Sequence, residues 1–255
     1  MIFNTYIGGG GTVNEIPEFT YSGDFEFIDD GDKNWRIRLL TSGTFAFNSL
    51  GNAANGIDVF CVGGGSSGGR GISEVSDTTY NSSGRGGGSG YTKTTKNVTV
   101  KRKTDYAVTI GAGGTANQTN GSNPVNGGTT SGFGVIASGG QGMDGGSGGG
   151  SGSTWWYSGS YTSGGRSDGA TNGGDSLGKG QISKPGPNGE TGNTKEFGEE
   201  AGLLYAKGGD GGGYSQAGAD GTANTGNGGG SSYYNKTAGN GGSGIVIIRN
   251  HREVV

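Results

Sequence analysis

Residues 139–152 read Gly-Gly-Gln-Gly-Met-Asp-Gly-Gly-Ser-Gly-Gly-Gly-Ser-Gly, and similar glycine runs recur between Gly63 and Gly244. In total 65 of the 255 residues are glycine, whereas only 4 are proline. An α-helix is disfavoured by about 1 kcal/mol for each Gly that replaces Ala, and a sheet of glycine has no side chains to pack. The ordered conformation that remains is the polyglycine II helix, an extended helix with three residues per turn whose backbone groups point outward.

An isolated polyglycine II helix is not expected to be stable. Ordering one residue costs about 1–2 kcal/mol, and one hydrogen bond returns only about 0.5–1.5 kcal/mol. Several such helices bonded to one another can balance this cost, provided that a hydrophobic core anchors them. Disorder of the whole chain is disfavoured because the chain contains 3 Trp, 11 Tyr and 9 Phe residues and has a net charge of only -3.

The segments between the glycine runs carry the patterns of β-strands. Trp35, Ile37 and Leu39 alternate with other residues, which is typical of a half-buried strand. Residues 57–62 are almost continuously apolar and suit a strand that is covered on both faces. Residues 91–110 are β-like again, and no stretch sustains the 3.6-residue period of a helix.

Apolar segments run directly into glycine at Gly63, Gly111, Gly139 and Gly208, and the last strand emerges from glycine at Gly244. We therefore predict an all-β fold, in which a jelly-roll-like β-sandwich carries an inserted bundle of polyglycine II helices, with little or no α-helix. The expected organisation is an N-terminal attachment or entry segment, a glycine-rich β-sandwich plus polyglycine-helix domain, and a C-terminal tail, at residues 1–23, 24–250 and 251–255.

Catalytic chemistry finds little support in the composition. The chain has one Cys and one His. We interpret Cys61 as a small buried hydrophobe of an apolar strand, and His251 as an exposed tail residue, because metal sites need several ligands. Residues 173–180 approach the phosphate-loop motif, but Gly180 stands where a Ser or Thr would bind magnesium.

Two further charged patterns have simpler interpretations than ligand binding. Asp30, Asp32 and Asn34 have the spacing of calcium-loop ligands, but Trp35 replaces the glycine that such a loop requires, so a turn between strands is expected. The basic residues within 93–103 can bind an anion, yet they suit an edge strand that is protected from aggregation. We predict that the chain is not an enzyme and has no cofactor and no metal.

The sequence also indicates which partners and locations are not expected. Residues 1–6 show no basic region, apolar core or cleavage pattern, so no Sec-type signal peptide is expected. No apolar run approaches the roughly 20 residues that a membrane helix needs, and membrane insertion is not expected. The net charge of -3 gives no indication of nucleic acid as a partner.

Aromatic residues that interrupt the glycine runs are the best functional signal. They cannot fit inside a polyglycine lattice and must lie at its rim, in its end loops or against the sandwich. Tyr and Trp among Ser, Gly and Asn are typical of recognition loops, although the same residues also suit a cap that excludes water. Both interpretations apply to the candidate residues, which are Tyr80, Trp155, Trp156, Tyr157, Tyr161, Tyr214, Tyr233 and Tyr234.

Four segments together resemble a known family. Residues 35–45, 59–65, 106–114 and 241–249 are similar in sequence and order to the glycine-rich domain of bacteriophage tail-fibre and tail-tip proteins. The resemblance covers about residues 24–250. The implied architecture is that of adhesins with polyglycine-helix bundles, and of the glycine-rich ectodomain of a vertebrate receptor tyrosine kinase.

The resemblance implies that loops at one end of a rigid bundle bind a receptor on the bacterial surface, either a protein or a glycan. It also implies contacts with other virion tail proteins, a location in the virion tail after synthesis in the host cytoplasm, and a homotrimer. The alternative is a purely structural virion subunit or spacer that makes no receptor contact.

Overall fold

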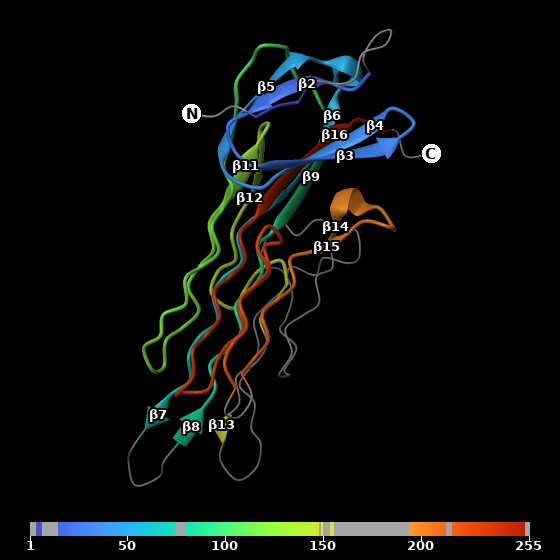
Figure 1. The fold of residues 1–255 in the computed structure, drawn as a ribbon. Coiled ribbons are helices and arrows are strands. Elements are labelled where there is room, and N and C mark those ends of the chain that lie inside the picture. Colours follow the sequence, from blue (N-terminus) through green and yellow to red (C-terminus); the bar gives the residue numbers. More distant parts are fainter. Residues whose placement is uncertain are drawn as a thin grey trace.

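The computed structural model describes residues 4–6, 15–74, 80–147, 149, 154–155, 194–212 and 216–252. Two antiparallel sheets pack face to face at one end, and extended glycine-rich segments run from them to the opposite end (Figure 1). The described residues contain no α-helix and only two 3-10 helices, η1 (Gly51–Asn55) and η2 (Glu196–Gly198). The prediction of an all-β fold is therefore confirmed.

The first sheet has four strands in the order β1 (Asn4–Tyr6), β2 (Glu18–Tyr21), β5 (Gly43–Ser49) and β10 (Tyr106–Val108). Strand β2 lies within residues 1–23, where we expected only an entry segment. Its Phe19 and Tyr21 side chains are fully buried, so the sandwich takes strands from this segment as well.

The second sheet has five strands in the order β3 (Phe25–Gly31), β4 (Asn34–Leu39), β16 (Ile245–Asn250), β6 (Ile57–Val62) and β9 (Thr92–Val98). The residues between β3 and β4 form the turn predicted for this segment, with positive φ at Asp32 and Lys33. Strand β9 is an edge strand, as the basic residues near it suggested.

The main hydrophobic core lies between the two sheets. Phe19, Phe45 and Phe47 from the first sheet meet Trp35 and Ile37 from the second, and all five side chains are fully buried. Phe19 and Phe45 stack with their ring centroids 5.0 Å apart, and Phe45 and Phe47 meet edge to face at 4.8 Å. The hairpin of β11 (Thr130–Gly132) and β12 (Val135–Ala137) adds Phe133, Val135 and Ala137 to this core.

Strand β6 is buried on both faces, as its continuous apolar sequence predicted. Val59 and Cys61 face the main core, whereas Phe60 and Val62 face a second cluster on the outer side of the sheet. That outer cluster is covered by residues 194–206, which include β14 (Thr194–Lys195), η2 and β15 (Leu204–Tyr205). The sandwich end of the molecule therefore has three layers.

Buried ion pairs accompany the outer layer. The fully buried Glu196 carboxylate pairs with Arg36 at 2.6 Å and with Arg38 at 3.1 Å, and it accepts a hydrogen bond from the Tyr205 hydroxyl at 3.3 Å. Burial, followed by the negative charge of Glu196, raises the pKa of Tyr205 above its ordinary value. Buried charges are paired in this way because an unpaired buried charge is costly.

His251 is not the exposed tail residue that the sequence suggested. Its Nδ1 lies 2.7 Å from the Oδ1 of Asp58, and its side chain is only 19% exposed. Asp58 is fully buried and also pairs with Arg249 at 3.1 Å. The chain continues past β16 to supply a second partner for this carboxylate.

The glycine-rich segments form a bundle of extended rods. We call residues 63–71 the central rod, because its backbone bonds to six neighbouring rods. Over residues 63–70, its amides donate hydrogen bonds to three of these rods, and its carbonyl oxygens accept hydrogen bonds from the other three. The first three are residues 84–91, 121–128 and 237–244, and the other three are residues 111–118, 138–147 and 226–232.

The hydrogen bonds of the central rod repeat every three residues. The amides of Gly63, Ser66 and Gly69 donate to the 84–91 rod, at the carbonyl oxygens of Tyr91, Gly88 and Arg85 in that order. The amides of Gly64, Ser67 and Arg70 donate in the same manner to the 121–128 rod, at Gly128, Val125 and Ser122. Since a three-residue period is what three residues per turn produce, we interpret the rods as polyglycine II helices.

The six neighbours also bond to one another and close a ring around the central rod. In order around the ring, and with the amide donor named before the carbonyl acceptor, these backbone bonds are Gly84 to Ser232, Gly242 to Asn227, Gly241 to Gly114, Gly128 to Ala112, Gly127 to Gly140 and Gly88 to Gly142. Two further rods lie outside the ring. Residues 206–212 bond to the 84–91 and 226–232 rods, and residues 216–222 bond to the 226–232 and 237–244 rods.

Glycine is required where the rods approach one another. A Cβ atom at Gly68 would lie 2.0 Å from the carbonyl oxygen of Gly230, and one at Gly64 would lie 2.2 Å from that of Ala112. Backbone atoms cannot yield to such contacts as a flexible side chain can.

None of the described segments is a helix long and apolar enough to cross a membrane.

Candidate recognition surface at the far ends of the rods

The rods end together at the pole of the molecule opposite the two sheets, where β7 (Ser73–Glu74), β8 (Tyr80–Ser82) and β13 (Thr154–Trp155) also lie (Figure 1). The turn at residues 117–122 joins two rods there, and residues 233–236 join two others. We call these two turns the tip turns. Their positions follow from the rods that precede and follow them.

Arg70 connects both tip turns to the central rod. Its Nε donates a hydrogen bond of 2.7 Å to the carbonyl oxygen of Tyr234, and its guanidinium also donates to the carbonyl oxygen of Gln118. Its backbone amide donates to Ser122 at 3.1 Å. One side chain at the end of the central rod therefore holds turns from two different parts of the chain.

Gln118 makes a second connection between the rods at this end. Its Nε2 donates to the carbonyl oxygen of Ala238 at 3.0 Å, and its Oε1 accepts from the Ala238 amide at 2.9 Å. The paired bonds imitate a backbone ladder and fix the direction of the side chain. Ile72 lies beside this turn, since its Cγ1 is only 2.7 Å from the position that a Cβ at Gly121 would take.

The two tyrosines of the second tip turn have different surroundings. Tyr233 is 5% exposed, whereas Tyr234 is half-buried and the following Asn235 is exposed. The two rings contact each other with centroids 4.7 Å apart and planes tilted by 60°. Tyr233 therefore suits the capping role and Tyr234 suits contact with a partner.

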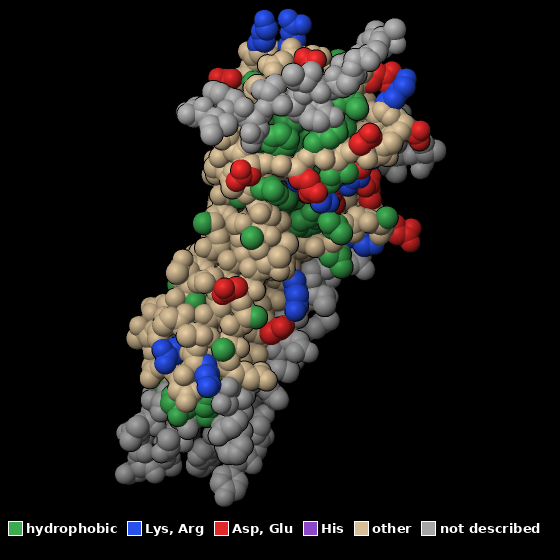
Figure 2. All heavy atoms as spheres, in the orientation of Figure 1, with side chains coloured by type: hydrophobic (Ala, Val, Ile, Leu, Met, Phe, Trp, Pro, Cys, Tyr) green, Lys and Arg blue, Asp and Glu red, His purple; other side chains and the backbone are tan. Residues whose placement is uncertain are grey.

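Figure 2 shows that the surface of the bundle consists mostly of backbone and small polar side chains, with basic and hydrophobic side chains beside its lower end. Acidic side chains are more frequent around the sandwich.

The other candidate aromatic residues are placed only in part. Tyr80 and Trp155 belong to β8 and β13, which pair with each other at the far end, and Ser83 just after β8 forms a β-bridge with Tyr233. The structure therefore brings the backbone of three candidate segments to the same pole. Four candidate residues lie outside the described residues, as does the segment 173–180, and these are Trp156, Tyr157, Tyr161 and Tyr214.

The carboxylates that have calcium-loop spacing are engaged elsewhere. Asp30 pairs with Arg36 at 2.9 Å and also with Arg252, whereas Asp32 is exposed in the turn between β3 and β4. Over the ranges that the structure describes, no three His, Cys, Asp or Glu side chains gather in a group that could hold a metal ion. Asp30 is therefore explained by its two arginine partners.

Arg70 and Gln118 were missed by the sequence reasoning. Arg70 is the one charged residue within the central rod, Gly-Gly-Gly-Ser-Ser-Gly-Gly-Arg-Gly, and this isolation is the signal that could have identified it. Gln118 has no comparable signal, because its role depends on a contact with Ala238, which lies 120 residues away.

The protein is thus a scaffold in which a β-sandwich carries a hydrogen-bonded bundle of glycine-rich rods. Residues 40–251 match the family described as glycine-rich domain. Because this match covers more than half of the chain, the protein belongs to the glycine-rich domain family. A search of curated proteins found no match.

Proposed function

We propose that this protein is a bacteriophage tail-fibre or tail-tip adhesin, which binds a receptor on the bacterial surface through the tip turns. The observation that carries the proposal is the central rod with its six bonded neighbours. A scaffold of this kind holds loops at fixed positions, while the loops themselves can change sequence without unfolding it.

The chemistry of the tip supports recognition of a protein or glycan surface. Tyr, Asn and Ser side chains of the 233–236 turn and its flanks offer flat apolar area and hydrogen-bonding groups at low entropic cost. Arg70 limits the movement of this turn before binding, and a turn that is already ordered loses less entropy when it binds.

Binding of the purified chain to bacterial cells tests the proposal. We expect saturable binding to the cells of at least one strain in a panel, and competition by surface glycan or protein extracted from that strain. The change Tyr234→Ser should weaken binding by about tenfold or more, as expected for an aromatic anchor, and leave the unfolding midpoint nearly unchanged.

Ile136→Ser provides the matched control. Ile136 is 64% exposed on β12 beside the sandwich, so this change also removes an exposed hydrophobic side chain, but far from the tip. Equal loss of binding in both variants would contradict the assignment of the tip. Absence of binding to every strain, together with incorporation into virions, would favour the structural subunit instead.

A further inference from the structure

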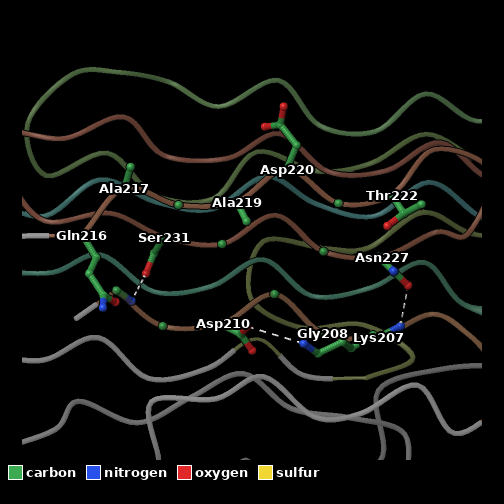
Figure 3. Close-up of a pocket in the computed structure, with 17 residues that line it drawn as sticks. Lys207, Gly208, Asp210, Gln216, Ala217, Ala219, Asp220, Thr222, Asn227 and Ser231 are labelled. Atoms are coloured by element: carbon green, nitrogen blue, oxygen red, sulfur yellow. Dashed lines mark hydrogen bonds and ion pairs between the residues drawn. The ribbon is translucent and has the colours of Figure 1, made fainter.

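A groove runs along the outside of the bundle between the two outer rods, residues 206–212 and 216–222, with the 226–232 rod as its floor (Figure 3). Its volume is about 330 Å³. Lys207 and Asp210 form an exposed ion pair of 3.4 Å on one wall. The groove lies on the side of the bundle, and none of the residues that line it belongs to the tip turns.

The floor rod has five bonded neighbours instead of the six that surround the central rod. They are the central rod, the 84–91 and 237–244 rods, and the two outer rods that form the walls. The two outer rods are not bonded to each other by any described backbone hydrogen bond. The groove therefore occupies the sixth position around the floor rod.

The hydrogen-bonding groups of the floor are spaced for one more rod. Within the described part of the chain, the carbonyl oxygens of Gly228 and Ser231 accept no hydrogen bond, and both residues line the groove. They are three residues apart, which is one turn of a polyglycine II helix. Each backbone carbonyl is a strong acceptor, so two unpaired carbonyl oxygens in a row along the groove are suited to receive the amides of a further rod.

One wall supplies the opposite groups. On the 216–222 rod, the amides of Ala219 and Asp220 donate no hydrogen bond to any described residue. The carbonyl oxygen of Ala219 is already used by Gly230. Figure 3 shows the Ala219 side chain directed toward the floor rod, whereas those of Ala217 and Asp220 are directed away.

We propose that the groove binds an extended glycine-rich peptide segment of another protein, which completes the sixth position around the floor rod. Its amides would donate to Gly228 and Ser231, and its carbonyl groups would accept from the wall. Glycine is needed wherever the guest faces a wall, since rod contacts in the bundle leave no space for Cβ, as at Gly218 and Gly209.

A labelled peptide of repeating Gly-Gly-Ser tests this proposal, with a peptide of repeating Ala-Ala-Ser as control. We expect saturable binding of the first peptide to the full chain by fluorescence anisotropy, and binding weaker by about tenfold or more for the second, because each added Cβ meets backbone. Amide exchange of Ala219 or Asp220 should slow when the first peptide is bound.

Ala219→Tyr should fill the groove and weaken binding by about tenfold or more. Ala112→Tyr is the matched control, because Ala112 is also an exposed rod alanine but does not line the groove. Lack of Gly-Gly-Ser binding, equal binding of both peptides, or unchanged binding by Ala219→Tyr would each overturn the proposal. If the Ala219→Tyr variant does not fold, amide exchange of Ala219 and Asp220 in the unaltered chain, with and without the Gly-Gly-Ser peptide, tests the proposal instead.

Discussion

The Nε of Arg70 donates a hydrogen bond of 2.7 Å to the carbonyl oxygen of Tyr234, which lies 164 residues further along the chain. This bond joins the end of the central rod to a tip turn. A hydrogen bond from a charged group contributes about 1.5–3 kcal/mol, so the turn is held more firmly than its own short-range contacts would allow.

Arg70→Met should therefore loosen the tip turns without unfolding the bundle. We expect amide exchange at Lys236 to become about tenfold faster, which corresponds to about 1.4 kcal/mol. The amide of Gly64 should exchange as before. Lys207→Met is the control, since it removes a cation from an outer rod whose exposed ion pair lies away from the tip turns. Equal effects of the two changes would contradict the role of Arg70.

Gly68→Ala should destabilise the bundle strongly, because its Cβ would lie 2.0 Å from the Gly230 carbonyl oxygen. We expect a loss of about 3 kcal/mol or more in the free energy of unfolding, measured with urea. Gly142→Ala has open space around Cβ and a φ of +63°, so only about 1–2 kcal/mol is expected. Similar losses would argue against close packing of the rods.

Asp58→Ala should cost about 3–5 kcal/mol in the free energy of unfolding. The change leaves the Arg249 side chain, which is 2% exposed, without this partner, and it also removes the partner of His251. Glu15→Gln breaks an exposed pair with Lys33 and should cost about 0–1 kcal/mol. A loss for Asp58→Ala as small as that for Glu15→Gln would contradict the buried pairing.

Asp30 should make stability depend on acid pH. Burial alone would raise its pKa, but the hydrogen bonds and charges of Arg252 and Arg36 outweigh burial and hold the pKa below its ordinary value. The contribution is present above the ordinary value of about 3.9 and is lost as the pH falls through the lower folded-state pKa.

Urea unfolding on the acid side of about pH 5 measures this contribution. Asp30→Asn should show a smaller decline in stability with falling pH than the unaltered chain. Asp32→Asn is the control, because it changes an exposed carboxylate two residues further along the chain, in the turn after β3. The same acid dependence in the Asp30→Asn variant and the unaltered chain would contradict the pairing of Asp30 with the two arginines.

The sequence predicted the strands and the points where rods begin. Trp35, Ile37 and Leu39 alternate as expected, and the apolar run at residues 57–62 is covered on both faces. The residues that cover the outer face of the sheet could not be predicted, because Phe197 lies in a 3-10 helix of three residues and Tyr205 in a strand of two, and neither is long enough to show a period. The buried Glu196 has a clear role only beside its arginine partners on β4, which are distant in sequence.

The rod arrangement was likewise only partly predictable. Glycine content indicated that extended helices would bond to each other, but it did not indicate which segment would be central. Many rods have similar glycine-rich sequences, so their side chains do not specify which rods lie next to one another. For the same reason the tip contacts of Arg70 and Gln118 could not be inferred from local sequence.

The most direct test of the rod scaffold is amide hydrogen exchange across residues 63–71. Every amide of this segment donates a backbone hydrogen bond to another segment, so all nine should exchange slowly and with similar protection. An ordinary edge strand would protect only alternate amides. Exchange of these amides at the rate of an unstructured peptide would contradict the scaffold on which the proposed recognition depends.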